Sequence, residues 1–424
     1  MIRLDRRAGR RRLLRPVAGS AGLFVAFTVF AQDTPAPAQP AAGRDGFTWK
    51  SADGAFVLKL RGYVQLDGRF YDGAAASDTF LVRRARPILE GTAFQIFDLR
   101  VMPDFGGGAT VLQDGYVEAR FLPVLRLRAG KFKPPVGLER LQSATDLLFV
   151  ERGMPTNLVP NRDVGVQLGG DAANARIQYA VGLFNGVPDG ASGDADNNSA
   201  KDVSARVFLR PLAGGSGAFG DLGFGVAFTS GDQAGNVTSP NLPVFRTAGQ
   251  VSFFSYRSDG TPAGTAVAGG KRRRVAPQAT FYRGPFGFLA EYVQSEQEVR
   301  LRPKKMELTN SAWQIAVSWV IGGKASYRGV SPVEPFSGPG SGPGAFELAA
   351  RYGELDVDAA AFPAFANPSA AAQSARALGF GANWWSNRNV RFMLSYERTS
   401  FDGGSAAGDR PDEKVLLTRF QVGF

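Results

Sequence analysis

The sequence contains neither cysteine nor histidine. Without cysteine there can be no disulfide, thiolate nucleophile or zinc–thiolate site, and without histidine there is no imidazole ligand and no Ser-His-Asp triad. Most hydrolase mechanisms are therefore excluded, and we expect a protein that is not an enzyme and needs no metal or cofactor. Beyond the N-terminal region, no stretch approaches the ~18 consecutive apolar residues that a membrane-spanning helix requires.

The N-terminal residues have the pattern of an export signal. Arginines between Arg3 and Arg15 precede an apolar stretch that ends in a small-residue cleavage site at Ala31. We expect residues 1–31 to be a signal peptide cleaved near Ala31, with twin-arginine export as the alternative to the general secretory route. This segment holds seven arginines and one aspartate, so its removal lowers the formal net charge from +11 to +5. Bulk charge then gives little support for nucleic-acid binding, and we expect no nucleic-acid partner.

The rest of the chain reads as one domain. Residues 32–46 form a Pro/Ala-rich segment, which we interpret as a disordered periplasmic lead-in. No linker divides the sequence after this point. Residues 47–424 are therefore expected to form a single folded unit.

Period-two alternation of apolar and polar residues dominates this unit. A soluble β-sandwich would also alternate, but Trp313 and Trp319 share one face six residues apart, as in the aromatic girdles that border a lipid-facing band. The pattern predicts an all-β fold, a transmembrane antiparallel β-barrel. Its sixteen predicted strands lie at 56–70, 79–91, 95–105, 111–121, 125–133, 163–170, 175–185, 201–210, 222–229, 271–283, 286–298, 307–321, 344–354, 376–385, 390–398 and 415–424.

The connections between these strands alternate between short periplasmic turns and longer extracellular loops. Connections 211–221 and 322–343 fit poorly, because both are long for periplasmic turns. Loop 134–162 carries the apolar stretch 147–150, so we expect it to fold into the barrel and narrow the pore. Loop 230–270 could form a second inward fold.

Beside the first of these loops lie Lys131 and Lys133. Strict alternation points both side chains outward, so they would reach the pore only if a bulge near Gly130 turned them inward. We include them among the candidates on that condition.

If the apolar face meets lipid, the other face meets the lumen, the water-filled interior of the barrel. Fifteen basic and seven acidic residues fall on that face, leaving out strand 79–91 because its phase is ambiguous. Rings of Arg and Lys favour anions, and the donors of Arg match phosphate oxygens. The predicted pore-lining and anion-binding residues are Lys59, Arg61, Arg69, Arg100, Arg126, Arg128, Lys131, Lys133, Arg140, Arg272 and Arg274. The run 271–274 could instead form a solvated rim or contact lipopolysaccharide.

Several segments, in order along the chain, resemble the phosphate-selective porin O and P family. They are 130–139, 149–152, 160–168, 183–186 and 344–352, together with the final residue, Phe424. The resemblance covers nearly the whole mature chain and implies a sixteen-stranded trimeric porin with inward-folded loops, whose basic residues pass phosphate or polyphosphate. Lys324 departs from it, since the family has an acidic residue there.

Together these observations predict an outer-membrane porin that allows passive diffusion of small anions through a basic-lined pore. A general porin with neutralised arginines is one alternative, and a surface adhesin anchored by the barrel is another. The expected partners are small inorganic anions, outer-membrane lipid and lipopolysaccharide, further copies of the chain in a homotrimer, and the barrel assembly machinery. That machinery would recognise Phe424 on the lipid-facing side of the last strand.

Overall fold

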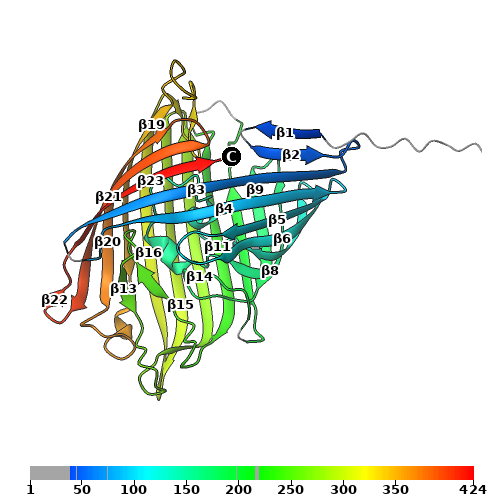
Figure 1. Cartoon of the computed structure of the whole chain (residues 1–424). Helices are drawn as coiled ribbons and strands as arrows, with labels where there is room; N and C mark the ends of the chain where they lie inside the picture. The colour runs from blue at the N-terminus through cyan, green and yellow to red at the C-terminus, as the bar shows by residue number, and fades with distance from the viewer. Residues whose placement is uncertain (1–38, 44, 74, 197, 215–218) are drawn as a thin grey trace, which may run out of the picture. The chain divides into compact units, whose positions relative to one another are not determined.

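The computed structural model describes residues 39–43, 45–73, 75–196, 198–214 and 219–424, so the predicted signal peptide lies outside the described residues. Sixteen antiparallel strands pair in chain order, and the last of them pairs with the first to close a barrel (Figure 1). The strands of the wall are β3 (Phe56–Asp72), β4 (Thr79–Ala93), β5 (Phe97–Asp104), β6 (Val111–Leu122), β7 (Leu125–Phe132), β8 (Asp163–Ala172), β9 (Ile177–Phe184), β10 (Asp202–Leu209), β11 (Leu222–Ala234), β14 (Val267–Arg283), β15 (Phe286–Leu301), β16 (Lys304–Ile321), β19 (Ala345–Asp356), β20 (Ala372–Trp385), β21 (Val390–Ser405) and β23 (Glu413–Gly423). The predicted sixteen-stranded barrel is confirmed.

Alternation along each strand separates an outer apolar face from an inner polar one. On β16, Ile315, Val317 and Trp319 are exposed on the outside, whereas Ala316 and Ser318 between them are buried inside. Tyr and Trp side chains on the outer face gather on a few strands. They are Trp49 on β2, Tyr179 on β9, and Tyr292, Trp313, Trp319, Tyr352, Trp384 and Tyr396 on β15 to β21. No helix among the described residues is long and apolar enough to cross a membrane.

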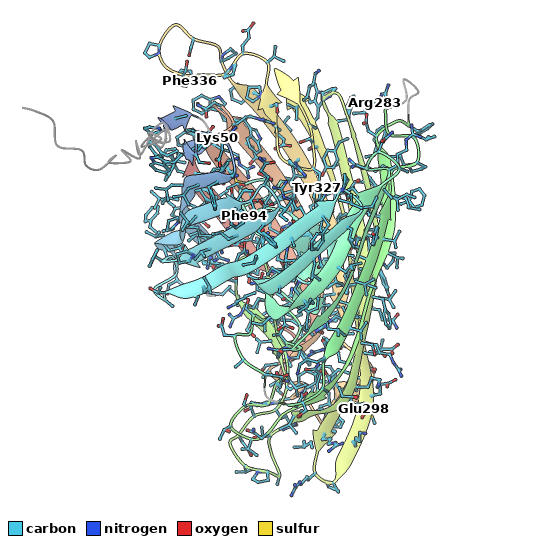
Figure 2. The ribbon with its side chains drawn as sticks, turned by 90° about the vertical axis from the view of Figure 1, so that its right-hand side faces the viewer. Lys50, Phe94, Arg283, Glu298, Tyr327 and Phe336 are labelled. Carbon is cyan, nitrogen blue, oxygen red and sulfur yellow. The ribbon has the colours of Figure 1, made fainter. Side chains whose placement is uncertain are left out.

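The two ends of the barrel differ in how the strands are joined. Figure 2 shows Arg283 and Phe336 at one end, where most turns are short, and Glu298 at the other, where most loops are long. At the second end β15 and β16 run further than predicted and meet in a turn of two residues, Arg302 and Pro303.

The long connection 322–344 at the end with short turns has a structural role. It contains β17 (Gly323–Lys324) and β18 (Ser331–Pro332), which pair with each other. Its residues Ala325 and Val330 pack with Trp385 in a buried cluster. This connection is unusually long for a turn because its apolar residues pack against Trp385.

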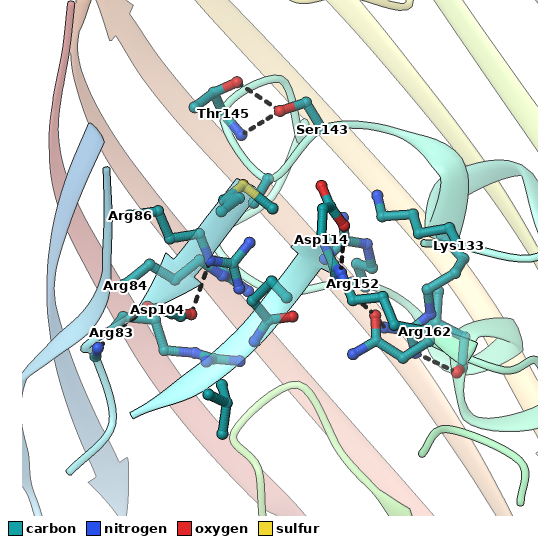
Figure 3. Close-up of a pocket in the computed structure, with 18 of the residues that line it drawn as sticks. Arg83, Arg84, Arg86, Asp104, Asp114, Lys133, Ser143, Thr145, Arg152 and Arg162 are labelled. Carbon is teal, nitrogen blue, oxygen red and sulfur yellow. Dashed lines mark hydrogen bonds and ion pairs between the residues drawn. The ribbon is translucent and has the colours of Figure 1, made fainter. Parts of the chain in front are cut away.

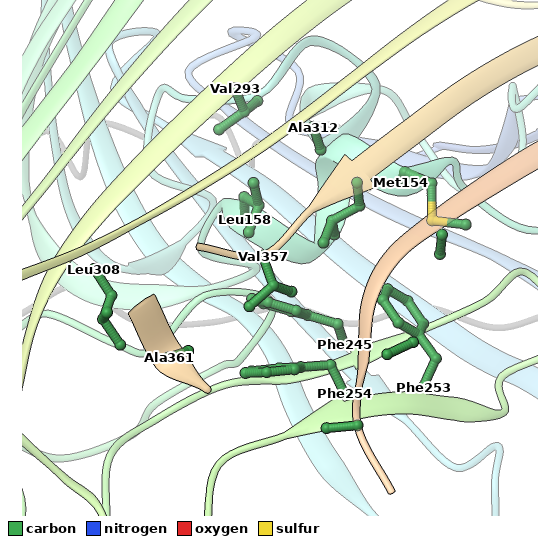
Figure 4. Close-up of a cluster of buried hydrophobic side chains, with 14 of the residues drawn as sticks. Met154, Leu158, Phe245, Phe253, Phe254, Val293, Leu308, Ala312, Val357 and Ala361 are labelled. Carbon is green, nitrogen blue, oxygen red and sulfur yellow. The ribbon is translucent and has the colours of Figure 1, made fainter. Parts of the chain in front are cut away.

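Three of the loops that fold inward from the opposite end share an apolar core. The sequence predicted an inward fold for the first and allowed one for the second, but did not indicate the third. Loop 133–162 contains α1 (Leu138–Leu141) and η1 (Met154–Leu158), loop 235–266 contains β12 (Val244–Arg246) and β13 (Ser252–Ser255), and loop 357–371 contains η2 (Ala359–Ala361). Apolar side chains from all three loops pack against inward-facing residues of β15 and β16 (Figure 4). This packing fills the lumen beside β15 and β16.

The remaining elements extend the wall. The strands β1 (Gln39–Gly43) and β2 (Gly46–Lys50) form a hairpin, and β2 pairs with β3 beyond the last pair that β3 makes with β23. Residues 39–43 of the predicted lead-in therefore form a strand, while residues 32–38 lie outside the described part. Near the other end, β22 (Gly408–Asp409) pairs with the end of β21.

Candidate anion-binding site

A cavity of about 970 Å³ lies in the lumen, lined chiefly by loop 133–162 and by inward-facing residues of β3 to β7 (Figure 3). Basic residues outnumber acidic ones on its surface by twelve to six. The basic residues are Arg61, Arg83, Arg84, Arg86, Arg100, Arg128, Lys133, Arg140, Arg152, Arg162, Arg246 and Arg388, and the acidic ones are Asp45, Asp104, Asp114, Asp146, Glu151 and Asp189.

Three of the arginines come from one short segment of β4. The pairing of β4 with β3 skips Arg83, which is therefore an extra residue in the ladder, a β-bulge. As a result Arg83, Arg84 and Arg86 all line the cavity, although regular alternation cannot turn two consecutive side chains inward. The bulge is also the reason why the alternation of this strand is ambiguous in the sequence.

Loop 133–162 contributes three cations, Lys133, Arg140 and Arg152, that have no acidic partner among the described residues. The Lys133 ammonium donates to the Gln142 carbonyl at 2.8 Å, and the Arg140 guanidinium donates to the Thr156 carbonyl at 2.5 Å. Arg152 likewise donates to two carbonyl oxygens, and none of the three forms an ion pair within the described part of the chain. The Nε of Arg140 is buried and has no hydrogen-bond partner among those residues.

Electrostatics make these cations favourable partners for an anion. Burial lowers the pKa of Lys133 well below its usual range, and the nearby charges of Arg152 and Arg162 lower this pKa further. Burial and the same neighbours also lower the pKa of Arg140. Buried positive charges without counter-charges are costly. An anion in the cavity would therefore stabilise the charged forms.

The loop is fixed to one side of the wall by Glu151. Its carboxylate lies 2.5 Å from Nε of Arg83 and between 3.6 and 3.8 Å from the guanidinium groups of Arg69, Arg84 and Arg419. Burial opposes the charged carboxylate, but the charges of Arg83, Arg84 and Arg419 hold the pKa of Glu151 well below its usual range. A single carboxylate thus joins the loop to β3, β4 and β23.

On the other side of the lumen, Glu291 of β15 holds the first turn of α1. Its carboxylate accepts hydrogen bonds from the backbone N–H groups of Leu138, at 2.6 Å, and of Glu139, at 3.3 Å. These are the unpaired donors that every helix has at its start. The loop is therefore anchored on both sides of the lumen, which fixes its cations in place.

Five of the residues predicted from the sequence line the cavity, namely Arg61, Arg100, Arg128, Lys133 and Arg140. Three of these are paired: Arg61 and Arg100 share Glu90, and Arg128 lies 2.6 Å from Glu118. The structure brings the unpaired Lys133 and Arg140 together in the loop.

The other six predicted residues do not line this cavity. Lys59 is exposed on β3, and Arg69 contacts Glu151. The remaining four contact carboxylates elsewhere: Arg126 contacts Asp171, Lys131 contacts Asp194, Arg272 contacts Asp202, and Arg274 contacts Asp189 and Asp202.

The bulge near Gly130, on which an inward direction of Lys131 and Lys133 depended, does not form. The pairs of β7 with β6 and β8 run through Gly130 without a shift, so Lys131 stays on the outward register. Lys133 reaches the cavity because the chain leaves the strand after Phe132.

The run 271–274 divides between the two faces of β14. Arg272 and Arg274 are buried inside, and Lys271 and Arg273 are partly exposed outside.

Comparison with known proteins identifies the family. The profile of the phosphate-selective porin O and P family matches residues 58–424. The chain belongs to this family. It is an outer-membrane porin, and the fold and family are those of channel proteins.

Solved porin structures share the fold at low identity. The outer membrane channel DcaP of Acinetobacter baumannii is 11% identical with a TM-score of 0.56, and the alignment covers 91% of this chain and 100% of that one. OmpT of Vibrio cholerae is 12% identical, with a TM-score of 0.55 and coverage of 87% and 98%. OprB of Pseudomonas putida is 10% identical, with a TM-score of 0.52 and coverage of 88% and 95%. No curated protein sequence matches this chain.

Proposed function

We propose that this porin allows the passive diffusion of small anions, phosphate and polyphosphate among them, through a lumen with excess positive charge. The observation that carries the proposal is the group of Lys133, Arg140 and Arg152, which lie in the constricting loop and form no ion pair among the described residues. Basic residues that line a narrow pore favour anions. Arg also offers a planar set of donors that matches carboxylate and phosphate oxygens.

A general porin without strong selectivity is the second candidate. It is favoured by the arginines of the wall, because Arg86, Arg100 and Arg128 each have an acidic partner. In that case the part of the lumen away from loop 133–162 would be polar, with a net charge close to zero.

Electrical recording separates the two candidates. The mature protein is reconstituted in a planar bilayer, and the zero-current potential is measured in a KCl gradient. We expect the zero-current potential to have the sign of a chloride-selective channel, and we expect added phosphate to reduce the chloride current. Cation preference would overturn the proposal, and a potential near zero would favour the general porin. The absence of channel steps would favour an adhesin.

We also propose that the porin is a homotrimer whose subunits meet through β3 to β8. One related structure, OmpT of Vibrio cholerae, is described as a trimer form. In this chain the outer faces of β3 to β8 carry no Tyr or Trp among the described residues, whereas β15 to β21 carry six. Tyr and Trp mark surfaces that meet the membrane–water interface. Their absence from β3 to β8 supports contact with other subunits there.

Export and assembly complete the proposal. Residues 1–31 would direct export, and the barrel assembly machinery would recognise Phe424. The partly exposed Lys271 and Arg273 lie on the outer face of β14, near the end with long loops, where lipopolysaccharide phosphates would meet them.

A further inference from the structure

Two buried carboxylates meet where loop 133–162 touches the wall of the barrel. Glu139 belongs to α1, Glu291 faces inward from β15, and each residue is only 4% exposed. The amide Nε2 of Gln314, on β16, lies 2.9 Å from a carboxylate oxygen of Glu139 and 2.9 Å from one of Glu291. These two oxygens are therefore no further apart than twice that distance, and the group that joins them is an uncharged donor.

Positive charge is scarce at this pair. Nη1 of Arg351 lies 3.6 Å from the Glu139 carboxylate, but the same guanidinium lies closer to Glu397, at 2.6 Å. Glu291 forms no ion pair within the described part of the chain, and its remaining partners are the backbone N–H groups of Leu138 and Glu139. One guanidinium, already shared with another acid, thus offsets two buried negative charges.

Other charged and titratable groups face the pair only at longer range. None of them donates a hydrogen bond to either carboxylate or forms an ion pair with it among the described residues. They are Arg140 and Arg152 of the loop, Arg206 of β10, Tyr282 of β14 and Tyr327 of connection 322–344.

Like charges that share a buried site disfavour each other, and burial disfavours the charged form of each. The pair therefore keeps one proton at a pH where an isolated glutamate side chain, with a pKa of about 4.3, has lost it. With one proton bound the repulsion is removed. A protonated carboxyl group still has an oxygen that can accept a hydrogen bond, so the N–H groups at the start of α1 keep an acceptor.

We propose that Glu139 and Glu291 form a proton-binding pair that sets how firmly loop 133–162 is held. The loop is held most firmly while the pair carries one proton. As the pH rises and this proton is lost, repulsion between the loop and β15 returns and the loop loosens. The inference goes beyond the proposed function, because it concerns the mobility of the loop that narrows the lumen and not the kind of ion that permeates.

The test measures current fluctuations as a function of pH. Single-channel current through the reconstituted porin is recorded in symmetric KCl at several values between about pH 4 and about pH 8. We expect the channel to be quiet at the acidic end. At the alkaline end it should spend at least about tenfold more time in substates with altered conductance, which is the factor that one pH unit of difference in proton binding gives.

Two variants assign this pH dependence to the pair. Glu291→Gln places an uncharged side chain of the same shape on β15 and should give quiet channels at every pH. Glu139→Gln should also remove the pH dependence, and it serves if the Glu291 variant fails to assemble.

The matched control is Glu347→Gln. Glu347 of β19 is a second buried, inward-facing carboxylate, 5% exposed, that forms no ion pair in the described part of the chain. It accepts hydrogen bonds from Asn383 and Trp385 of β20 rather than from loop 133–162. The control variant should keep the pH dependence of the wild type.

Three results would overturn the inference. They are a wild-type channel whose fluctuations do not change with pH or grow toward acid, a Glu291→Gln channel that keeps the pH dependence, and a Glu347→Gln channel that loses it as fully. None of these results depends on whether anions or cations permeate, so a failure here leaves the proposed function unaffected. Cation selectivity of the wild type would overturn the proposed function alone.

Discussion

Replacing Glu151 by Gln should release loop 133–162 from the wall. The carboxylate is buried, with 3% of the residue exposed, and four arginines surround it. Removing one side of a buried ion pair leaves uncompensated charge and costs about 3–5 kcal/mol. We therefore expect Glu151→Gln to lower the free energy of unfolding by about that amount in urea titrations of the folded barrel.

The matched control is Glu298→Gln. Its carboxylate forms an ion pair with Lys305 only, among the described residues, and the side chain of Lys305 is 49% exposed, so the loss should be about 1 kcal/mol or less. In single-channel records the Glu151 variant should also show larger current fluctuations, because the loop is no longer fixed to β3, β4 and β23. Equal stability losses in the two variants, with equally quiet channels, would refute the idea that Glu151 anchors the loop.

Two further predictions concern pH and assembly. Because the pKa of Lys133 is lowered, raising the pH from about 7 to about 10 should deprotonate this residue earlier than an ordinary lysine and reduce anion preference. Lys133→Arg should remove this pH dependence in zero-current potentials, and an unchanged profile would contradict the assignment. Leu99→Gln, on the outer face of β5, should weaken the trimer on semi-native gels, while Leu348→Gln, on the outer face of β19, should not. Equal effects would argue against β3 to β8 as the interface.

The sequence was sufficient to predict the barrel because period-two alternation survives in almost every strand. It was insufficient at Arg83, where one extra residue turns two neighbouring arginines inward. A bulge changes the face of every residue beyond it, and nothing in the local residue types marks its position. For the same reason the sequence left open a bulge near Gly130, where the structure has a regular ladder.

Ion pairing was the second limit. Arg272 and Arg274 face inward as predicted, but their partners Asp189 and Asp202 are separated from them by about 70 residues or more of chain. Such partners meet only when the barrel has closed. Arg152 lines the cavity and forms no ion pair in the described part of the chain, but it was missed as a candidate. Loop residues have no alternation from which an inward direction can be inferred.

The contribution of Arg140 and Arg152 of the loop to anion preference is tested most directly by the zero-current potential in a KCl gradient. It should be measured for the wild type, for Arg140→Gln combined with Arg152→Gln, and for Arg398→Gln, whose exposed side chain pairs with Asp412. We expect a chloride-selective potential in the wild type and in Arg398→Gln, and a potential closer to zero in the double variant. An unchanged potential in the double variant, or cation selectivity in the wild type, would contradict the assignment of anion preference to these residues.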